Sequence, residues 1–362
     1  MVKLKGLSKF FTTDRGLVKA VDDIDIEVKE GEFFTLLGPS GCGKSTTLRC
    51  IAGLERPDYG EITIGEEMVF SAEKNHFIPA SKRDIAMVFQ SYAIWPHMNV
   101  YANVAYPLQG KMPKKAVRDQ VMEVLDMVGI KDLESRPAPQ LSGGQQQRVA
   151  VARAIVKGAK VLLFDEPLSN LDAKMRIHMR VELRELQNRL GITFIYVTHD
   201  QEEAISLSDR VAVMDKGRII ELASPADIYL KPRDHFTADF IGACNFLPGK
   251  VLNTEKDSIL VGTEIGELSC LSPENTASEV VVGIRPEHIE IFKKGEELEK
   301  NQNVVQGIVV SAVFLGSAID CTVKAGSKLL KVQVLSSKYV TDGEEVHLYL
   351  PPQLCIALSA KK

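Results

Sequence analysis

No apolar run among the 362 residues approaches the ~20 consecutive apolar residues that a membrane-spanning helix requires. The six cysteines include no C-x-x-C pair, which is typical of a reducing compartment and indicates no cysteine-based metal site. The lysines near the N-terminus are not followed by an apolar core, so we expect no signal peptide there. Lys and Arg (44) nearly balance Asp and Glu (48), which argues against nucleic-acid binding through overall charge.

The composition that remains is ordinary for a globular protein, with 45% apolar and 25% charged residues, and the length suggests roughly two domains. Up to about residue 240, short apolar runs alternate with segments of helical periodicity. This order is typical of an α/β fold with a parallel sheet covered on both faces. The remaining residues form short β-like runs separated by glycines and polar turns, which indicates a small all-β barrel. We therefore predict an α/β domain over residues 1–237 and an all-β domain over 238–362.

The expected elements of the first domain can be placed from apolar periodicity and from Gly and Pro breakers. We predict an antiparallel β region within residues 2–37, strands at 33–37, 61–64, 85–89, 161–164, 193–197 and 211–214, and helices at 46–52, 114–128, 146–156, 174–190 and 201–206. In the second domain we predict strands at 258–261, 279–284, 304–313, 319–323, 329–334 and 346–350.

A glycine-rich loop between an apolar run and a helical segment is the strongest local signal. Its residues are Gly38, Pro39, Ser40, Gly41, Cys42, Gly43, Lys44 and Ser45, followed by Thr46. The spacing is that of a P-loop, whose glycines let the backbone approach phosphate oxygens and whose free amides at the helix start face the anion. Lys44 can reach the β- and γ-phosphates, and the Ser45 hydroxyl can complete a Mg²⁺ shell. The alternative is that this is an ordinary glycine-rich turn in which Lys and Ser occur by chance. The flanking strand and helix favour the P-loop over this alternative.

Polar residues directly follow three of the apolar runs. Asp165 and Glu166 follow residues 161–164, and in this position an Asp can hold Mg²⁺ while a Glu polarises a water for attack on a γ-phosphate. Alone, such a pair is more often a helix or loop start, but with a P-loop it predicts a nucleoside triphosphatase. Gln90 and His199 also lie just past strands, whose carboxyl ends converge on the phosphate crevice. Taken singly, each of these two is a weak signal, because a polar strand end is commonly a turn.

Together these motifs resemble the ATP-binding-cassette (ABC) ATPases over residues 3–236. Leu141-Ser-Gly-Gly-Gln145, Phe164-Asp-Glu-Pro-Leu-Ser-Asn-Leu-Asp172 and Thr198-His-Asp200 follow the P-loop in the family's order, and Leu-Ser-Gly-Gly-Gln is the most specific of them. The resemblance implies a P-loop NTPase cassette with a parallel sheet core, an antiparallel β subdomain and a helical subdomain, followed by a small OB-like barrel. It also implies ATP and Mg²⁺ as the groups bound.

The resemblance further implies a role for each motif residue. Glu166 is similar to the catalytic base, Asp165 to the Mg²⁺-holding Asp, and His199 to the γ-phosphate histidine. Gln90 resembles the glutamine whose loop senses nucleotide and contacts the membrane partner. From its chemistry alone, the Gln90 amide can also ligate Mg²⁺, together with Ser45 and Asp165. The expected catalytic set is therefore Glu166, His199, Gln90 and Lys44.

An aromatic side chain near the N-terminus is expected to stack on adenine. Phe11 looks like this family residue, because it follows Leu7-Ser-Lys-Phe10. The stretch over residues 12–17 is longer than usual in the family, so Phe10 remains an alternative.

In this family the segment Ser142, Gly143, Gly144 and Gln145 acts across a dimer, on the nucleotide of the second subunit. From the residues themselves, Ser142 and the glycine amides at a helix start form an anion site, and Ser142 is expected to cap that helix. Asp172 matches the loop that crosses to the second subunit. One P-loop and one complete Leu-Ser-Gly-Gly-Gln per chain make a homodimer sufficient.

The C-terminal part resembles the regulatory, TOBE-like barrel of importer-type ATPases. The similarity is carried by Phe240-Ile-Gly-Ala-Cys-Asn-Phe246 and Gly283-Ile-Arg-Pro-Glu-His-Ile289, with a looser match over 307–316. It implies the energy subunit of a prokaryotic solute importer at the cytoplasmic face of the membrane. The implied partners are two transmembrane permease subunits, which would cover the apolar segment 92–98, and indirectly an extracytoplasmic solute-binding protein, but no nucleic acid.

The resemblance leaves the solute and one other function class open. The nearest subfamilies are the maltose-type sugar importers and the spermidine/iron-type importers, and Trp95-Pro-His-Met98 and the short barrel lean slightly to the second. The alternative is a soluble ABC ATPase of translation or DNA maintenance. Such proteins usually carry two cassettes or long coiled coils, and this chain has one cassette and no long heptad run.

Overall fold

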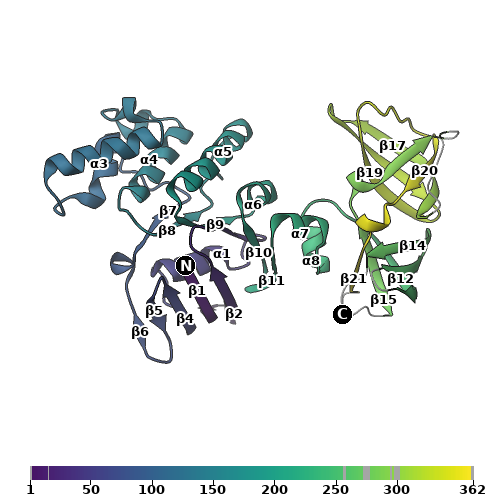
Figure 1. The fold of residues 1–362 in the computed structure, drawn as a ribbon, viewed down its shortest axis with the longest axis horizontal. Coiled ribbons are helices and arrows are strands. Elements are labelled where there is room, and N and C mark those ends of the chain that lie inside the picture. Colours follow the sequence, from purple (N-terminus) through teal and green to yellow (C-terminus); the bar gives the residue numbers. More distant parts are fainter. Residues whose placement is uncertain are drawn as a thin grey trace. The chain divides into compact units, whose positions relative to one another are not determined.

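The computed structural model describes residues 2–14, 16–255, 258–271, 278–293, 296 and 302–359. The chain divides into two compact units, Met1–Pro225 and Ala226–Lys362 (Figure 1). The domain boundary predicted after residue 237 lies inside α8 (His235–Phe240), a helix of the second unit.

The first unit is built on a six-stranded sheet with the order β11-β10-β3-β9-β8-β7. The strands are β3 (Phe33–Leu37), β7 (Ile85–Val88), β8 (Val161–Asp165), β9 (Thr193–Thr198), β10 (Arg210–Asp215) and β11 (Arg218–Ala223). All neighbouring pairs are parallel except β10 with β11. Every residue of β3, β8 and β9 is buried, as their continuous apolar runs predict. The parallel order brings the carboxyl ends of β3, β7, β8 and β9 to one edge.

A second, antiparallel sheet of five strands covers one face of this core, and its order is β2-β1-β4-β5-β6. The strands are β1 (Val2–Thr13), β2 (Gly16–Val28), β4 (Tyr59–Ile64), β5 (Glu67–Ser71) and β6 (His76–Phe77). The first two confirm the antiparallel region predicted near the N-terminus. Side chains of this sheet, of α1 (Lys44–Ala52) and of the parallel sheet share one apolar core, which includes Leu4, Ile24, Leu36, Leu48 and Ile195.

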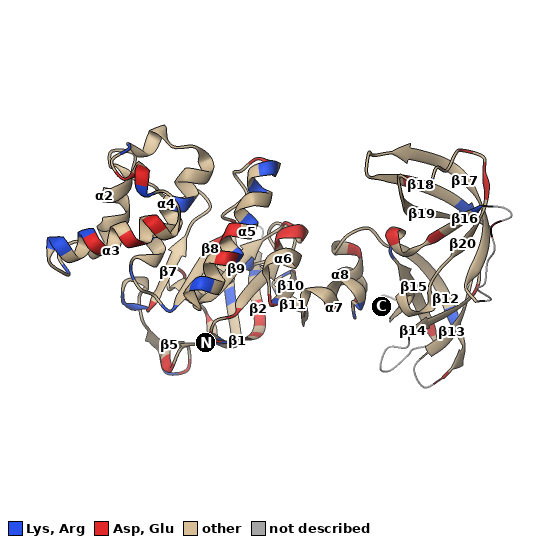
Figure 2. Ribbon diagram, turned by 45° about the horizontal axis from the view of Figure 1, so that its top comes forward, with Lys and Arg blue, Asp and Glu red and all other residues tan. Residues whose placement is uncertain are grey.

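Helices pack on the opposite face of the parallel sheet (Figure 1). They are α2 (Val100–Ala105), α3 (Lys114–Met127), α4 (Gly143–Ile155), α5 (Ala173–Leu190) and α6 (Gln201–Leu207), with short 3-10 turns at Ala80–Lys82, Tyr106–Leu108, Lys131–Leu133 and Ala138–Gln140. The three basic residues of α3 (Lys114, Lys115 and Arg118) precede its three acidic residues (Asp119, Glu123 and Asp126), so this helix carries charges of both signs (Figure 2). Within the described ranges, no helix has the length and apolarity that crossing a membrane requires.

The second unit contains α7 (Pro225–Leu230) from its second residue onward, α8 and two β structures. A closed barrel is formed by β12 (Asn245–Thr254), β13 (Ser258–Thr263), β14 (Gly266–Leu271), β21 (Ile356–Ser359) and β15 (Glu279–Ile284). A five-stranded sheet follows the order β16 (Glu290–Lys293), β20 (Glu345–Tyr349), β17 (Val304–Phe314), β18 (Ala318–Ala325) and β19 (Lys328–Leu335). Further 3-10 turns lie at Pro286–His288 and Pro352–Leu354.

The predicted small barrel is thus confirmed, but it accounts for only one of the two β structures in this unit. Both structures contribute to one apolar core, which includes Leu247, Val282 and Leu348. They are also joined by a side chain: Asn245 Nδ2 donates to the Lys331 carbonyl and the Lys331 amide donates to Asn245 Oδ1, each at 2.8 Å. The barrel and the sheet therefore form one folded body.

Candidate functional site

The P-loop connects the carboxyl end of β3 to the first turn of α1. Gly43, directly before α1, has φ 107°, and a Cβ there would lie 2.0 Å from the Ala20 carbonyl oxygen. A Cβ on Gly38 would lie 2.3 Å from the Met214 carbonyl oxygen. Only glycine fits either position, because the neighbouring backbone leaves no room for a side chain. Among the residues that the structure describes, no side chain caps α1, so its first amides are left without a side-chain acceptor.

Lys44 is buried inside the loop. Its Nζ donates to the carbonyl oxygens of Gly38 at 2.7 Å and Pro39 at 2.9 Å, so the backbone curls around the ammonium group. The Cys42 thiol lies 3.8 Å from the same nitrogen, and burial raises the pKa of this thiol. The loop therefore concentrates a cation and unpaired amides at the strand edge, an arrangement that suits a polyphosphate.

Ser45 and Asp165 meet across the parallel sheet edge. Ser45 Oγ donates to Asp165 Oδ1 at 2.7 Å, and Arg49 lies 3.9 Å from the other carboxylate oxygen. Asp165 is the last residue of β8 and is only 5% exposed, which directs its carboxylate to the P-loop rather than to solvent. The pair supplies two hard oxygen ligands next to Lys44, the type of ligand that Mg²⁺ binds.

Glu166 and His199 form a second pair at the same edge. The Nδ1 atom of His199 lies 3.0 Å from Oε2 of Glu166, and both side chains reach solvent. Glu166 has φ 45°, a left-handed backbone that non-glycine residues rarely adopt. Its amide donates to the Val197 carbonyl at 3.0 Å and its carbonyl accepts from Ser169 Oγ at 2.8 Å, so both neighbours hold this conformation. Strained backbone of this kind clusters at active sites.

Gln90 lies two residues beyond the end of β7 and contacts the loop that follows Glu166. Its Nε2 donates to Ser169 Oγ at 3.3 Å, and its carbonyl accepts from Asn170 Nδ2 at 2.8 Å. The structure therefore links Gln90, Ser169, Glu166 and His199 in one chain of contacts. Sequence reasoning did not single out Ser169 or Asn170, although both lie in the polar stretch that follows the Asp-Glu pair.

The Leu-Ser-Gly-Gly-Gln segment starts α4 at Gly143, earlier than the start near residue 146 that we predicted. The reason is a capping box: Ser142 Oγ accepts from the Gln145 amide at 3.4 Å and Gln145 Oε1 accepts from the Ser142 amide at 3.0 Å. The amides of Gly143 and Gly144 lie in the first turn and have no carbonyl partner within the helix. Among the described residues, no hydrogen bond joins this segment to the P-loop of its own chain.

A network of charged and hydroxyl groups lies behind His199. Asp172 caps α5 by accepting from the Met175 amide at 3.0 Å, and Arg176 in the next turn donates to the Leu171 carbonyl and to Asp200 Oδ2, both at 3.2 Å. The buried Glu203 accepts from Tyr196 at 2.8 Å and from Thr198 at 2.7 Å. Burial raises the pKa of Glu203, while these two hydroxyl groups oppose the shift. The network ties the Asp172 loop to the segment that carries His199.

The two candidate adenine-stacking residues lie on the β1–β2 hairpin. Phe11 pairs with Val18, is 36% exposed, and has Lys9 Nζ at 5.1 Å from its ring. Phe10 instead packs against Tyr59, with 5.8 Å between ring centroids. The unusually long stretch is the end of this hairpin, and Arg15 within it lies outside the described residues. Phe11 is therefore the ring that is more open to a ligand.

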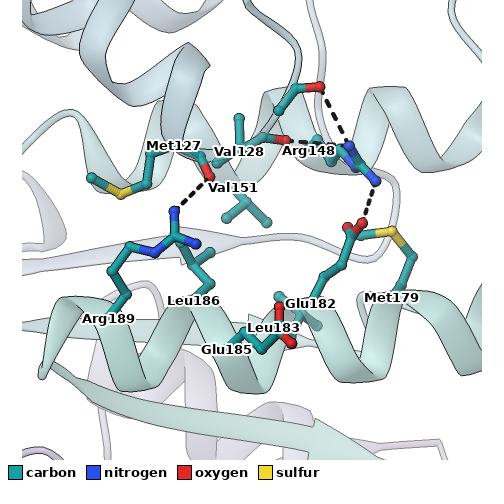
Figure 3. A pocket seen from close by; sticks show the side chains of 11 residues that line it. Met127, Val128, Arg148, Val151, Met179, Glu182, Leu183, Glu185, Leu186 and Arg189 are labelled. Atoms are coloured by element: carbon teal, nitrogen blue, oxygen red, sulfur yellow. Dashed lines mark hydrogen bonds and ion pairs between the residues drawn. The ribbon is translucent and has the colours of Figure 1, made fainter.

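A cavity of about 180 Å³ lies where the end of α3, α4 and α5 meet (Figure 3). Arg148 of α4 bridges it: the guanidinium donates to the carbonyls of Val128 and Gly129, both at 3.4 Å, and forms an ion pair with Glu182 of α5 (Figure 3). This arginine therefore links α4 to both of its helical neighbours. None of the residues expected in the nucleotide site lines this cavity.

Comparison with known proteins relates the whole chain to one family. An "ABC transporter" family model matches residues 21–169 and a "TOBE domain" model matches residues 282–358. The trehalose/maltose import ATP-binding protein MalK of Thermococcus litoralis is 45% identical over 345 residues, which cover 91% of each chain. The spermidine/putrescine import ATP-binding protein PotA of Pseudomonas fluorescens is 41% identical over 367 residues, covering 99% of this chain and 98% of that protein.

A solved structure agrees with these relatives. The dimeric post-hydrolysis state of the ATP-binding cassette MJ0796, bound to ADP and Pi, is 31% identical with a TM-score of 0.54. It covers 62% of this chain and 99% of that chain. The comparisons confirm the ABC cassette and the TOBE domain that the motifs predicted, and none of them supports the alternative role in translation or DNA maintenance.

Import ATP-binding subunits bind ATP, dimerise as cassettes and work with membrane permease components. The alignments to two such subunits, at 45% and 41% identity, cover 91% and 99% of this chain and therefore include both of its units. The chain therefore belongs to the ATP-binding subunits of ABC importers and is an ATPase whose hydrolysis is coupled to transport.

Proposed function

We propose that this chain hydrolyses ATP at the edge where β3, β8 and β9 end, with Glu166 as the general base. The observation that carries this proposal is the 3.0 Å contact between Glu166 and His199, beside a P-loop that holds a buried lysine. The Glu166 carboxylate can take a proton from a water as the water oxygen attacks the γ-phosphorus and the bond to the β-γ bridging oxygen breaks. The products are ADP and phosphate, as in the bound state of the related cassette.

His199 has two ring nitrogens with separate tasks in this proposal. Nδ1 faces Glu166 and orients its carboxylate, which leaves Nε2 to face the γ-phosphate. Because 54% of the side chain is exposed, the ring is accessible to a ligand from the solvent side. Gln90 contacts the same loop through Ser169, so it can respond to a change at Glu166.

Lys44 and the first amides of α1 supply the positive charge for the phosphates. The ammonium group is already positioned by two carbonyl oxygens, so a phosphate gains a cation with little further ordering. Thr46 follows in the same turn, and Phe11 offers its ring to adenine. The stacking is favourable because the Phe11 face is partly open while Phe10 packs on Tyr59.

A magnesium ion fits the donors at this edge. Ser45 Oγ and Asp165 Oδ1 already lie 2.7 Å apart. The Gln90 amide oxygen is a third hard ligand, and Gln90 contacts Ser169 in the loop that follows Asp165 and Glu166. We propose that Ser45, Asp165 and Gln90 hold Mg²⁺ with ATP. The ion would supply charge neutralisation for the phosphate oxygens.

The catalytic site is completed by a second copy of the chain in this proposal. Ser142 and Gly143 are exposed at the start of α4, with first-turn amides available to an anion, and they are not bonded to their own P-loop. They would contact the γ-phosphate of the second subunit, with Gly144 and Gln145 supporting the turn. ATP would then hold the homodimer closed, and hydrolysis would open it.

The closing and opening of the dimer would drive two permease subunits at the cytoplasmic face of the membrane. An extracytoplasmic solute-binding protein would deliver the solute to them. The relatives import trehalose/maltose or spermidine/putrescine by their names, so we propose that the solute is a sugar or a polyamine of these classes.

Affinity isolation of the tagged chain from its native, mildly solubilised membranes tests this assignment. We expect multi-span membrane proteins to be recovered, and the isolated complex in vesicles to hydrolyse ATP faster with its solute than without. Maltose-type sugars and polyamines are the solutes to add first. Recovery of ribosomal or nucleic-acid partners, with no multi-span protein, would refute the transport role and leave only the ATPase.

A further inference from the structure

The segment that follows Gln90 carries two consecutive left-handed residues. Tyr92 has φ 60° and Ala93 has φ 46°, and neither is a glycine. Such a backbone is unfavourable for L-residues and persists only where the surrounding structure enforces it. Tyr92 is buried, while Ala93, Pro96 and His97 are exposed. The segment therefore has a rigid inner part and an open outer part.

Arg153 of α4 holds the two strained residues. Its Nη2 donates to the Tyr92 carbonyl and its Nη1 to the Ala93 carbonyl, both at 2.7 Å. The guanidinium also lies 4.6 Å from the centre of the Trp95 ring. A planar guanidinium has the fork geometry for two parallel bonds and a flat face for an aromatic ring, and lysine has neither. The Arg153 side chain thus contacts two backbone carbonyls and one aromatic ring of the segment.

The surroundings of Arg153 favour these contacts. The side chain is half-buried, and burial lowers the pKa of its guanidinium. Among the described residues its partners are two carbonyl oxygens and an aromatic ring, not a carboxylate. A partly buried guanidinium without a carboxylate depends on its backbone acceptors, because leaving donors unpaired away from water is costly.

A second anchor holds the far side of Trp95. The fully buried Asn103 of α2 accepts from the Trp95 amide at 2.9 Å and donates to the Trp95 carbonyl at 3.2 Å. The Trp95 ring also packs against Tyr106, with 4.4 Å between centroids. Trp95 is therefore held by Asn103 of α2 and by Arg153 of α4. A displacement of α4 relative to α2 must then change the contacts of the Trp95 ring.

We infer that Arg153 is the positioning residue through which α4 transmits the nucleotide state to the segment 92–98. Arg153 lies in the last turn of α4, and Ser142 caps its first turn, so one rigid helix about 18 Å long joins the proposed phosphate contact to the segment. ATP bound against the Ser142 end in the dimer shifts α4, and Arg153 carries Tyr92, Ala93 and Trp95 with it. This inference rests on the proposed function, because it requires ATP to be held across the dimer.

The chain contains its own reporter for this movement, because Trp95 is its one tryptophan. The experiment uses the full chain with Glu166→Gln, so that bound ATP is not consumed, and records tryptophan emission and hydrogen exchange of residues 91–98 with MgATP and with MgADP. Arg153→Met removes the charge and the fork, and Arg153→Lys keeps only the charge. Arg118→Lys is the matched control, since this arginine stacks 4.9 Å from the Tyr101 ring without bonding the segment.

We expect ATP to change the Trp95 emission in the parent and in Arg118→Lys, and to leave it unchanged in Arg153→Met, with Arg153→Lys between them. Amide exchange in the segment should rise at least about tenfold in Arg153→Met, the scale of a lost charge-assisted hydrogen bond. ATP affinity, measured separately, should stay within about threefold of the parent, because Arg153 does not touch the P-loop.

The outcomes separate the inference from the proposed function. A parent chain that binds ATP and dimerises but shows no ATP-dependent change at Trp95 would overturn the inference and leave the ATPase intact. An equal ATP response in Arg153→Met and in the parent would overturn it as well. If the parent does not bind ATP at all, the proposed function fails first. Should Arg153→Met not fold, the comparison of Arg153→Lys with Arg118→Lys decides by the same criterion.

Discussion

Oε2 of Glu166 lies 3.0 Å from Nδ1 of His199, and the two residues follow neighbouring parallel strands, β8 and β9. The contact orients the Glu166 carboxylate through His199, a side chain that follows the neighbouring strand β9. The left-handed backbone of Glu166 fixes the same carboxylate from β8. A base held from both sides needs little reorganisation when water attacks. The two side chains should therefore act together in catalysis.

Replacing Glu166 or His199 tests whether the two side chains act together in catalysis. We predict that Glu166→Gln keeps ATP binding but lowers kcat by at least ~10²-fold, the usual scale for a general base. His199→Ala should also lower kcat, and the double variant should be about as slow as the slower single variant, because the residues share one task. Steady-state hydrolysis and equilibrium ATP binding measure this. Near wild-type hydrolysis in Glu166→Gln would remove this residue from the role.

Lys44 provides a separate test of the P-loop. Lys44→Ala removes the cation and leaves the Gly38 and Pro39 carbonyls without their donor. A charge-assisted hydrogen bond contributes ~1.5–3 kcal/mol, so we predict that the Kd for ATP rises about 10- to 100-fold. Calorimetric titration of ATP measures this, with the exposed Lys74→Ala as the control. Unchanged affinity in Lys44→Ala would contradict the phosphate-binding assignment.

Arg83 should be one of the residues on which the stability of the first unit depends most. It is 1% exposed and donates to the carbonyls of Cys50 at 2.8 Å and Ile51 at 2.7 Å, at the end of α1, and to the Ile78 carbonyl at 2.8 Å. In Arg83→Met the Cys50 carbonyl keeps the Gly53 amide as a donor at 3.1 Å, but the Ile51 and Ile78 carbonyls lose their Arg83 donors. An unpaired buried acceptor costs about 1–3 kcal/mol, so we predict a loss of about 2 kcal/mol or more in the free energy of unfolding.

Urea unfolding of the first unit measures the Arg83 effect, and the transition of the second unit in the same sample serves as an internal reference. The neighbouring Lys82→Met is the matched control, because Lys82 is exposed. A change in Arg83→Met within about 0.5 kcal/mol of this control would show that other groups satisfy these carbonyls.

Glu203 predicts a pH dependence of stability. Burial raises its pKa above the ordinary 4.5, with Asp200 adding to the shift and Tyr196, Thr198 and Arg176 opposing it. The unfolded chain therefore releases this proton at lower pH than the folded chain. Between the two pKa values the folded state binds more protons, so the contribution of Glu203 to stability falls as the pH rises above 4.5.

Glu203→Gln removes this ionisation and keeps an oxygen that can accept from Tyr196 and Thr198. We predict that the stability of the variant relative to wild type increases as the pH rises from 4.5 toward neutrality. Urea midpoints over this range measure the difference. A difference that stays constant, or decreases with pH, would show that Glu203 is ionised in the folded state throughout.

Much of the fold could be predicted because the strands of the first unit are short continuous apolar runs. Asp165, His199 and Gln90 follow such runs, and since parallel strands share an edge, their proximity follows from the pattern. The start of α4 was predicted too late, although Ser142 and Gln145 have the spacing of a capping box. The second β structure of the C-terminal unit was not separated from the barrel, because alternation within strands does not encode which strands pair.

The arginines that hold the site could not be predicted from the sequence. Arg83 bonds a carbonyl 33 residues away and Arg153 bonds one 61 residues away, and within the part of the chain that the structure describes neither has a carboxylate partner that a local charge pattern could indicate. Backbone acceptors carry no side-chain signal, because every residue has a carbonyl group. Only the folded path of the chain shows which carbonyls face each guanidinium.

The paired hydrogen bonds between Asn245 and Lys331 have a consequence for self-association. β19 is the last strand of its sheet, so its outer backbone groups could pair with a strand of another molecule, as unprotected edges do in aggregation. Asn245 offers the amide and carbonyl of its side chain in place of that foreign strand and occupies both backbone groups of Lys331. A single carboxamide thus blocks this stretch of the edge, and the protein should be less prone to aggregate there than its open sheet alone would suggest.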